Sequence, residues 1–145
     1  MATIQRFEDL EVWQKAKVFA KNIFALSNNG LFAKDYELKN QMNRSSGSIM
    51  DNIAEGFERG GKAEFINFLT IAKGSCAETR SQLYRGFDRN YYSEQEMKIH
   101  LELAEEIGRM IGGLINYLNK SEVKGRKFKD RVPTTQNSKS QTQNL

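Results

Sequence analysis

The sequence contains a single cysteine, a single histidine and no long apolar run. One cysteine excludes an intramolecular disulfide, and Cys76 lies on the apolar stripe of a predicted helix, where we expect a small buried hydrophobe. No stretch approaches the roughly 18 consecutive apolar residues of a membrane span. The N-terminal segment MATIQRFEDLEVW has no apolar signal core. We therefore expect a cytoplasmic protein with no membrane partner.

Residues that commonly carry catalysis or bind metals are also sparse. His100 has no Cys or Ser close to it in the sequence that could act as a nucleophile. The Glu-x-x-His pairs of di-iron bundles are absent, and the glycine pairs at 60–61 and 112–113 lack the strand and lysine of a phosphate-binding loop. The sequence therefore predicts a protein that is not an enzyme, with no catalytic residue, cofactor, metal or small-molecule substrate.

Charge is distributed unevenly along the chain. Residues 1–120 hold 16 basic and 16 acidic side chains, so the net charge of +4 comes entirely from residues 121–145. Residues 133–145 contain no apolar residue except Leu145. Such a segment cannot bury enough surface to offset the entropy lost on ordering. We expect a domain at 1–120 followed by a basic, disordered tail at 121–145.

Hydrophobic periodicity predicts four long helices and no strand. Their expected spans are 9 to about 27, 35 to 58, 62 to 89, and 94 to about 120, with Ser93 and Glu96 forming a capping box before the last one. Leu31 and Phe32 fall in the first loop, where apolar residues usually plug the end of a bundle. Short loops between long helices predict an all-α, antiparallel up-down-up-down four-helix bundle.

The central hairpin, residues 44–78, carries polar side chains next to its apolar stripes. These residues are Arg44, Ser48, Asn52, Glu55, Arg59, Glu64, Ser75 and Glu78. A buried polar group is costly unless it is hydrogen-bonded, so such a set would fix helix register and oligomer geometry. We favour this structural role over a ligand site. The small residues 45–48 would let another backbone approach closely.

The last helix has two neighbouring apolar lines where a monomeric bundle needs one. The first line holds Met97, Leu101, Ala104, Gly108, Ile111, Ile115 and Leu118. The second line holds Leu103, Ile107, Met110, Leu114 and Tyr117. We interpret the second line as a candidate oligomer interface; the alternative is a helix buried centrally within one chain.

Two clusters of basic residues are candidates for phosphate contacts with nucleic acid. One is the series Arg80, Arg85 and Arg89 late in the third helix, which ends beside Tyr91 and Tyr92. The other is the tail cluster Lys124, Arg126, Lys127, Lys129 and Arg131, with Phe128 between them as a possible stacking group. Either cluster alone is more often a solvated face, but a ring oligomer would repeat it and strengthen weak contacts.

Three segments resemble one known family together, in the right order and spacing. They are FEDLEVWQKA at 7–16, YELKNQMNRSSGSIMDNIAEGFERG from Tyr36 and EFINFLTIAKGSCAETRSQL from Glu64. They are similar to the bacterial four helix bundle proteins, also called S23 or intervening-sequence proteins because some are encoded within insertions of 23S ribosomal RNA genes. The matching motif positions are Trp13, Arg44, Ser48, Asn52, Glu55, Gly56, Arg59, Glu64, Phe65, Gly74, Ser75 and Glu78. The loop LFAKDYEL departs from the proline and glycine that the family tends to have there.

The resemblance implies a ring-shaped homopentamer of four-helix protomers. The family is related to the accessory protein of diversity-generating retroelements, which binds nucleic acid and partners a reverse transcriptase. It has no established enzymatic activity, and an RNA-binding role is suggested for it. Our first hypothesis is therefore a ring-forming adaptor or scaffold that binds nucleic acid, RNA before DNA. The second is a protein–protein scaffold or accessory subunit that binds no nucleic acid itself.

Overall fold

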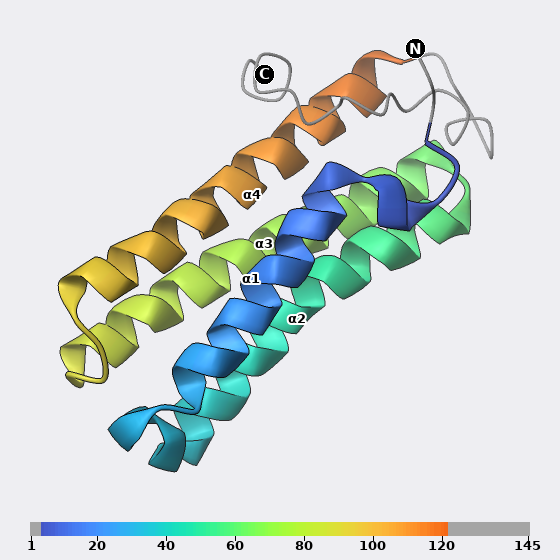
Figure 1. The fold of residues 1–145 in the computed structure, drawn as a ribbon. Helices are drawn as coiled ribbons and strands as arrows, with labels where there is room; N and C mark the ends of the chain where they lie inside the picture. The colour runs from blue at the N-terminus through green and yellow to red at the C-terminus, as the bar shows by residue number, and fades with distance from the viewer. Residues whose placement is uncertain (1–3, 122–145) are drawn as a thin grey trace.

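The structure is a computed structural model that describes residues 4–121. In chain order, the elements are η1 (Phe7–Asp9), α1 (Glu11–Ser27), η2 (Gly30–Lys34), α2 (Tyr36–Arg59), α3 (Lys62–Asp88) and α4 (Glu94–Lys120). Successive helices run antiparallel and pack side by side (Figure 1), and α4 also contacts α1, which closes the bundle. The predicted all-α, up-down-up-down four-helix bundle is confirmed, while the predicted tail lies outside the described residues from residue 122 onward.

Local capping signals set the ends of the helices. Asp35 caps α2, because its carboxylate accepts a hydrogen bond of 3.2 Å from the backbone N–H of Leu38. Gly60 ends α2 with a φ of 86°, a left-handed conformation that favours glycine. Ser93 and Glu96 form the predicted capping box at the start of α4. At the other end of the chain, η1 precedes α1, so the first long helix begins two residues later than predicted.

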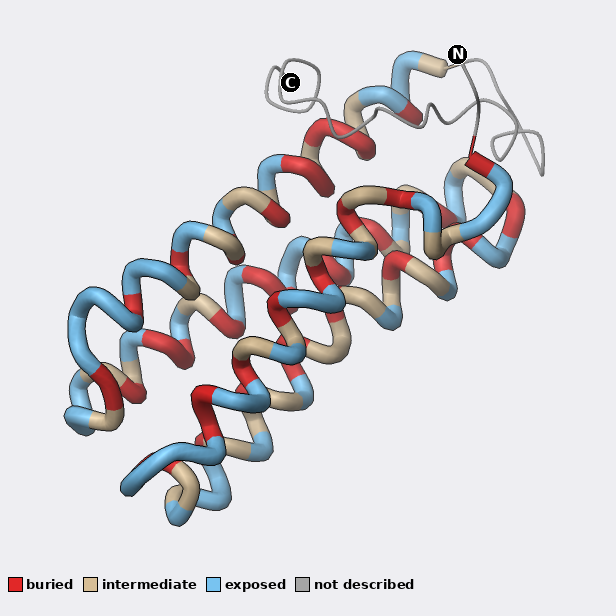
Figure 2. Tube along the Cα trace, viewed as in Figure 1, coloured by how far each residue is buried: buried red, intermediate tan, exposed pale blue. Residues whose placement is uncertain are grey.

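The apolar stripes of the four helices meet along the axis of the bundle. Buried positions recur on the inward side of each helix (Figure 2), and Phe19, Phe57 and Phe65 are fully buried. Gly56 allows α2 and α3 to approach closely, since a Cβ built on it would lie 2.6 Å from the Cβ of Phe68. The sequence pattern of apolar residues therefore places the core where we expect it.

The loop between α1 and α2 closes one end of the bundle with Phe32 alone. This ring is fully buried and stacks on Tyr91, with 5.1 Å between the ring centroids. Leu31 is 67% exposed, so the predicted plug is wrong for this residue. The reason is η2, because neighbouring residues of a 3-10 helix point to different sides.

Candidate functional site

A buried polar network joins α2 to α3 on the inner side of the central hairpin. The hydroxyl of Ser45 lies 2.7 Å from the hydroxyl of Thr79 and donates to Oε1 of Gln82 at 2.7 Å. All three side chains are buried. Thr79 and Gln82 were not predicted from the sequence, and Ser45 was given only a steric role, although Ser45 and Thr79 lie three residues after Met42 and Cys76 on the apolar stripes. That spacing was the available signal.

Three of the predicted polar hairpin residues are joined to one another by hydrogen bonds. The hydroxyl of Ser75 donates to Ser48 across the two helices at 3.0 Å, and the amide of Asn52 donates to the same Ser48 oxygen at 2.8 Å. Glu55 instead faces solvent and pairs with Arg59 at 3.0 Å, one turn along the same helix. The structure therefore brings Ser48, Asn52 and Ser75 together at the centre of the seam and places Glu55 outside this group.

The remaining members of the set, Arg44, Glu64 and Glu78, are exposed. Arg44 and Glu78 line a pocket of about 180 Å³ over the α2–α3 seam, and its other lining residues are Gln41, Ser45, Ser48 and Ser75. Neither charged side chain forms an ion pair or a hydrogen bond within residues 4–121. Two opposite charges at family motif positions are thus available to contact something outside the described protomer.

The small segment in the middle of α2 divides between two environments. Ser45 and Ser46 are buried. A Cβ on Gly47, in contrast, would meet no atom within 4 Å. The predicted close approach of another backbone is therefore not made at Gly47 within the protomer.

The predicted arginine series on α3 does not form one surface. Arg80 lies 3.7 Å from Glu105 of α4, whereas Arg85 donates to Gln41 of α2 at 3.0 Å. Their partners lie on different helices, since residues five apart in a helix do not share a face. These two side chains therefore point to opposite sides of α3.

Arg89, the third member, is bound to Asp35 through a contact of 2.6 Å between Nη1 and Oδ2. Asp35 also accepts hydrogen bonds from Tyr91 and the backbone N–H of Leu38. These donors, Tyr91 foremost, hold the pKa of Asp35 below its usual value. Arg89 thus has a structural partner, and a shared phosphate-binding stripe is not what the structure forms.

The apolar line predicted as an oligomer interface on α4 is mostly buried inside the protomer. Ile107, Met110 and Leu114 are 0%, 3% and 1% exposed, so the prediction is wrong for these three residues. The reason is that α4 packs against both α3 and α1. The ion pair between Lys15 of α1 and Glu106 of α4, at 3.2 Å, places this side of α4 next to α1.

Two residues at the edges of this line remain interface candidates. Leu103 is partly buried against the core, and Tyr117 is 36% exposed. A charged residue at Leu114 would disrupt the core itself, so substitution there cannot test assembly.

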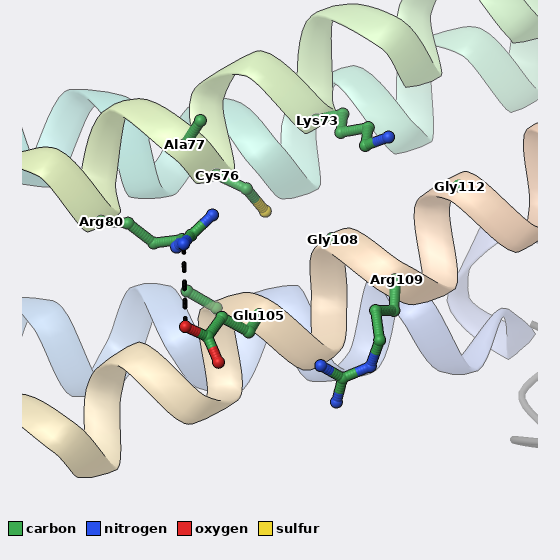
Figure 3. Close-up of a pocket in the computed structure, with 9 residues that line it drawn as sticks. Lys73, Cys76, Ala77, Arg80, Glu105, Gly108, Arg109 and Gly112 are labelled. Atoms are coloured by element: carbon green, nitrogen blue, oxygen red, sulfur yellow. Dashed lines mark ion pairs between the residues drawn. The ribbon is translucent and has the colours of Figure 1, made fainter. Parts of the chain in front are cut away.

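A pocket of about 390 Å³ opens between α3 and α4 (Figure 3). Its lining residues are Lys73, Cys76, Ala77 and Arg80 from α3, and Ala104, Glu105, Gly108, Arg109 and Gly112 from α4. We call it the α3–α4 groove. Small side chains form its floor, and a Cβ built on Gly108 would meet no atom within 4 Å. The sequence analysis missed Lys73 and Arg109, for which no motif gave a signal; the spacing of Gly108 and Gly112 was the only hint.

Positive charge dominates the rim of the α3–α4 groove. Arg80 reaches toward Glu105 across the two helices (Figure 3), and its Nε atom is buried without a hydrogen-bond partner among the described residues. Lys73 and Arg109 form no ion pair or hydrogen bond within residues 4–121. The rim therefore presents three cationic side chains and one carboxylate.

The groove also contains the thiol of Cys76. Burial raises the pKa of this thiol to about 12, so it is neutral at physiological pH and a poor nucleophile. His100 lies away from it, with Nδ1 2.7 Å from the backbone oxygen of Glu96. Over residues 4–121 no group of three or more His, Cys, Asp or Glu side chains is placed to hold a metal ion. None of the described helices is long and apolar enough to cross a membrane.

The tail cluster, Lys124, Arg126, Lys127, Lys129 and Arg131, lies outside the described residues together with Phe128. Its role stays a prediction.

Comparison with known proteins connects this geometry to a family. The family model of the 23S rRNA-intervening sequence proteins matches residues 8–113. The chain belongs to this family. A solved structure of a protein of unknown function from the S23 ribosomal protein family of Bacteroides thetaiotaomicron VPI-5482 is similar, with 27% identity and a TM-score of 0.66. The similarity covers 72% of this chain and 97% of the Bacteroides chain. No curated protein matches the chain.

Two features of the match bear on the candidate sites. The match to the 23S rRNA-intervening sequence family includes every residue of α2 and α3 and the full lining of the α3–α4 groove. It ends before the basic cluster at 124–131. The groove is thus part of the family domain, whereas the tail cluster is an addition beyond it.

Proposed function

We propose that this 23S rRNA-intervening sequence family protein is a non-enzymatic, cytoplasmic adaptor that forms a ring-shaped homopentamer and binds RNA. The observation that carries the proposal is the charge of the α3–α4 groove, whose rim holds three cations and one carboxylate. Residues 1–120 as a whole carry no net charge, so this excess is local to the groove. Such a local excess attracts phosphate groups, which supply most of the sequence-independent affinity for nucleic acid.

Lys73 and Arg109 are the residues of the groove that would contact phosphate. Neither is neutralised by a carboxylate of the described protomer, whereas Arg80 shares its charge with Glu105 at 3.7 Å. Five more cations follow in the tail between residues 124 and 131. A ring would repeat both groups around its axis, and linked weak contacts bind far more tightly than each one alone.

A non-catalytic role agrees with the chemistry of the groove. Its one nucleophilic side chain, Cys76, is held neutral by burial. The described residues lining the groove include no histidine. The groove is built to bind through charge and shape.

The test is the salt dependence of RNA binding by the full chain. We expect affinity for a short fluorescent RNA to fall roughly a thousandfold between about 50 and 200 mM salt if about six phosphates are contacted. Replacing Lys73 and Arg109 together with glutamine should weaken binding and flatten this dependence. The matched control is Lys98→Gln, because Lys98 pairs with Glu94 at 3.5 Å on the exposed side of α4. An RNA affinity that changes neither with salt concentration nor with the double substitution would contradict the proposal.

A second candidate function is a protein–protein scaffold, or an accessory subunit of an enzyme such as a reverse transcriptase. It is favoured by the outer face of α3, where the exposed residues Asn67, Thr70, Ile71 and Gly74 carry no charge. Depletion of charge is typical of the centre of a protein interface. Arg44 and Glu78, whose charges are unpaired within residues 4–121, lie beside this face. They could pair with a neighbouring protomer of the ring. A ring that carries no RNA at low salt would favour this candidate.

A further inference from the structure

The α3–α4 groove has an apolar floor and a cationic rim, so a ligand that fills it needs both an apolar part and an anionic part. The floor is apolar and shallow, because Cys76 and Ala104 have small side chains and Gly108 has none. A pocket of about 390 Å³ falls within the range of small-molecule sites. A flat ring could therefore lie against the two helices at this point.

The rim supplies donors and positive charge. The Nε atom of Arg80 is buried and has no acceptor among residues 4–121, and an unsatisfied buried donor costs roughly 1–3 kcal/mol. Lys73 and Arg109 are free to bind an anion, as described above. The ligand that fits both parts has a flat ring with hydrogen-bond acceptors and a phosphate group attached.

Other occupants fit this arrangement less well. The basic segment at 124–131 would be repelled by the three cations of the rim. The backbone of a duplex would use only the rim, since its bases are stacked and do not reach an apolar floor between two helices. A single strand can turn one base out of its stack, and such splayed bases are the usual targets of RNA-binding proteins.

We propose that the α3–α4 groove binds one unstacked nucleotide of a single-stranded RNA, with the base on the floor at Gly108 and the phosphate on the cationic rim. This inference rests on the proposed RNA-binding function and adds to it a preference for single-stranded RNA. The protein should bind single strands more tightly than a duplex of the same sequence.

Gly108 offers a direct test, because a methyl group there would enter the groove without touching the rest of the protein. A Cβ at this position meets nothing within 4 Å, and the same is true of Gly47 on α2. We would measure binding of a short fluorescent single-stranded RNA and of its duplex to the full chain with Gly108→Ala, Gly108→Leu and the control Gly47→Leu. Thermal unfolding of each variant shows that the bundle is intact; Gly108→Ala should be at least as stable as the native chain, since alanine favours helix over glycine.

We expect Gly108→Leu to weaken single-strand binding about tenfold and to leave duplex binding unchanged, so that the preference disappears. Gly108→Ala should have a smaller effect in the same direction, and Gly47→Leu should have none. Adenosine monophosphate should compete with the single strand, whereas inorganic phosphate at the same concentration should not.

The outcomes separate this inference from the function on which it rests. RNA binding that is equal for Gly108→Leu and Gly47→Leu would overturn the nucleotide site and leave the proposed function standing. Competition by inorganic phosphate as strong as by the nucleotide would reduce the groove to a phosphate site and also overturn the inference. No binding of either RNA form at low salt would refute both proposals.

Discussion

The hydroxyl of Tyr91 donates a hydrogen bond of 2.6 Å to the carboxylate of Asp35, although the two residues lie 56 positions apart. The same carboxylate caps α2 and pairs with Arg89 at the end of α3. Asp35 thus ties the start of α2 to the loop between α3 and α4. It lies at the end of the bundle that Phe32 closes by stacking on the ring of Tyr91.

Replacing Asp35 with alanine should lower the free energy of unfolding by about 1–2 kcal/mol, the usual loss for a helix N-cap. The folded-state pKa of Asp35 is lowered from 3.8, so its contribution is complete above that pH and is lost as the pH falls through the folded-state value. Urea unfolding at neutral and acidic pH measures both effects. The Glu102→Gln variant is the control, because Glu102 is exposed on α4; an equal loss in both variants would contradict the role of Asp35.

Replacing Ser45 with alanine should destabilise the bundle by about 1–3 kcal/mol, because Gln82 and Thr79 would lose a buried partner. Ser81→Ala on the exposed side of α3 should change stability by less than about 0.5 kcal/mol. Chemical denaturation of the two variants gives the comparison. If Ser45→Ala proved as stable as Ser81→Ala, the network would not hold α2 and α3 in register.

Alkaline pH should destabilise the fold through Cys76 and Tyr92. Burial raises the pKa of Cys76 from 9.0 to about 12 and raises that of Tyr92 above 10.0. The unfolded chain therefore releases these protons first, and stability falls as the pH rises above 9.0. Unfolding of Cys76→Ala should lose the part of this slope that begins near 9.0. Tyr92→Phe should reduce the part that begins near 10.0, and the remainder belongs to Tyr91, because its hydrogen bond to Asp35 also raises its pKa. Tyr84→Phe removes a hydroxyl at an exposed position of α3 and is the matched control.

Alanine substitutions at two glycines of α2 should have opposite effects. Gly47→Ala adds a methyl group in open space and should stabilise the helix by up to about 1 kcal/mol. Gly56→Ala would place its Cβ 2.6 Å from the Cβ of Phe68 and force α2 and α3 apart, which costs roughly 1–3 kcal/mol for an overpacked contact. Thermal unfolding distinguishes them, and a gain in stability at Gly56 would mean that the two helices are less closely packed than described.

The periodicity of apolar residues was sufficient to predict the four helices and their order. The capping box at Ser93 could be predicted because it depends on a few neighbouring residues. Phe32 and Leu31 were not distinguishable, because the direction of each side chain depends on a 3-10 turn that the residue types do not specify. Local signals therefore predicted the helices. Errors arose where the loop geometry determines the direction of a side chain.

Contacts between helices were harder to predict. The second line on α4 was interpreted as an outer face, and the ion pair between Lys15 and Glu106 shows why that fails: a neighbouring helix already covers this side. The pairing of Arg80 with Glu105 and the freedom of Lys73 likewise depend on how α3 meets α4. Charge counts along the chain contain no such information, so the groove could be found only in the fold.

The most direct measurement is the mass of the purified full chain in solution together with its absorbance ratio at 260 and 280 nm, before and after a high-salt wash. The account predicts a species with the mass of a ring, and an absorbance ratio that falls after the wash because bound nucleic acid is removed. A ring with a low ratio throughout would favour the protein scaffold. A monomer that carries no nucleic acid would contradict the account.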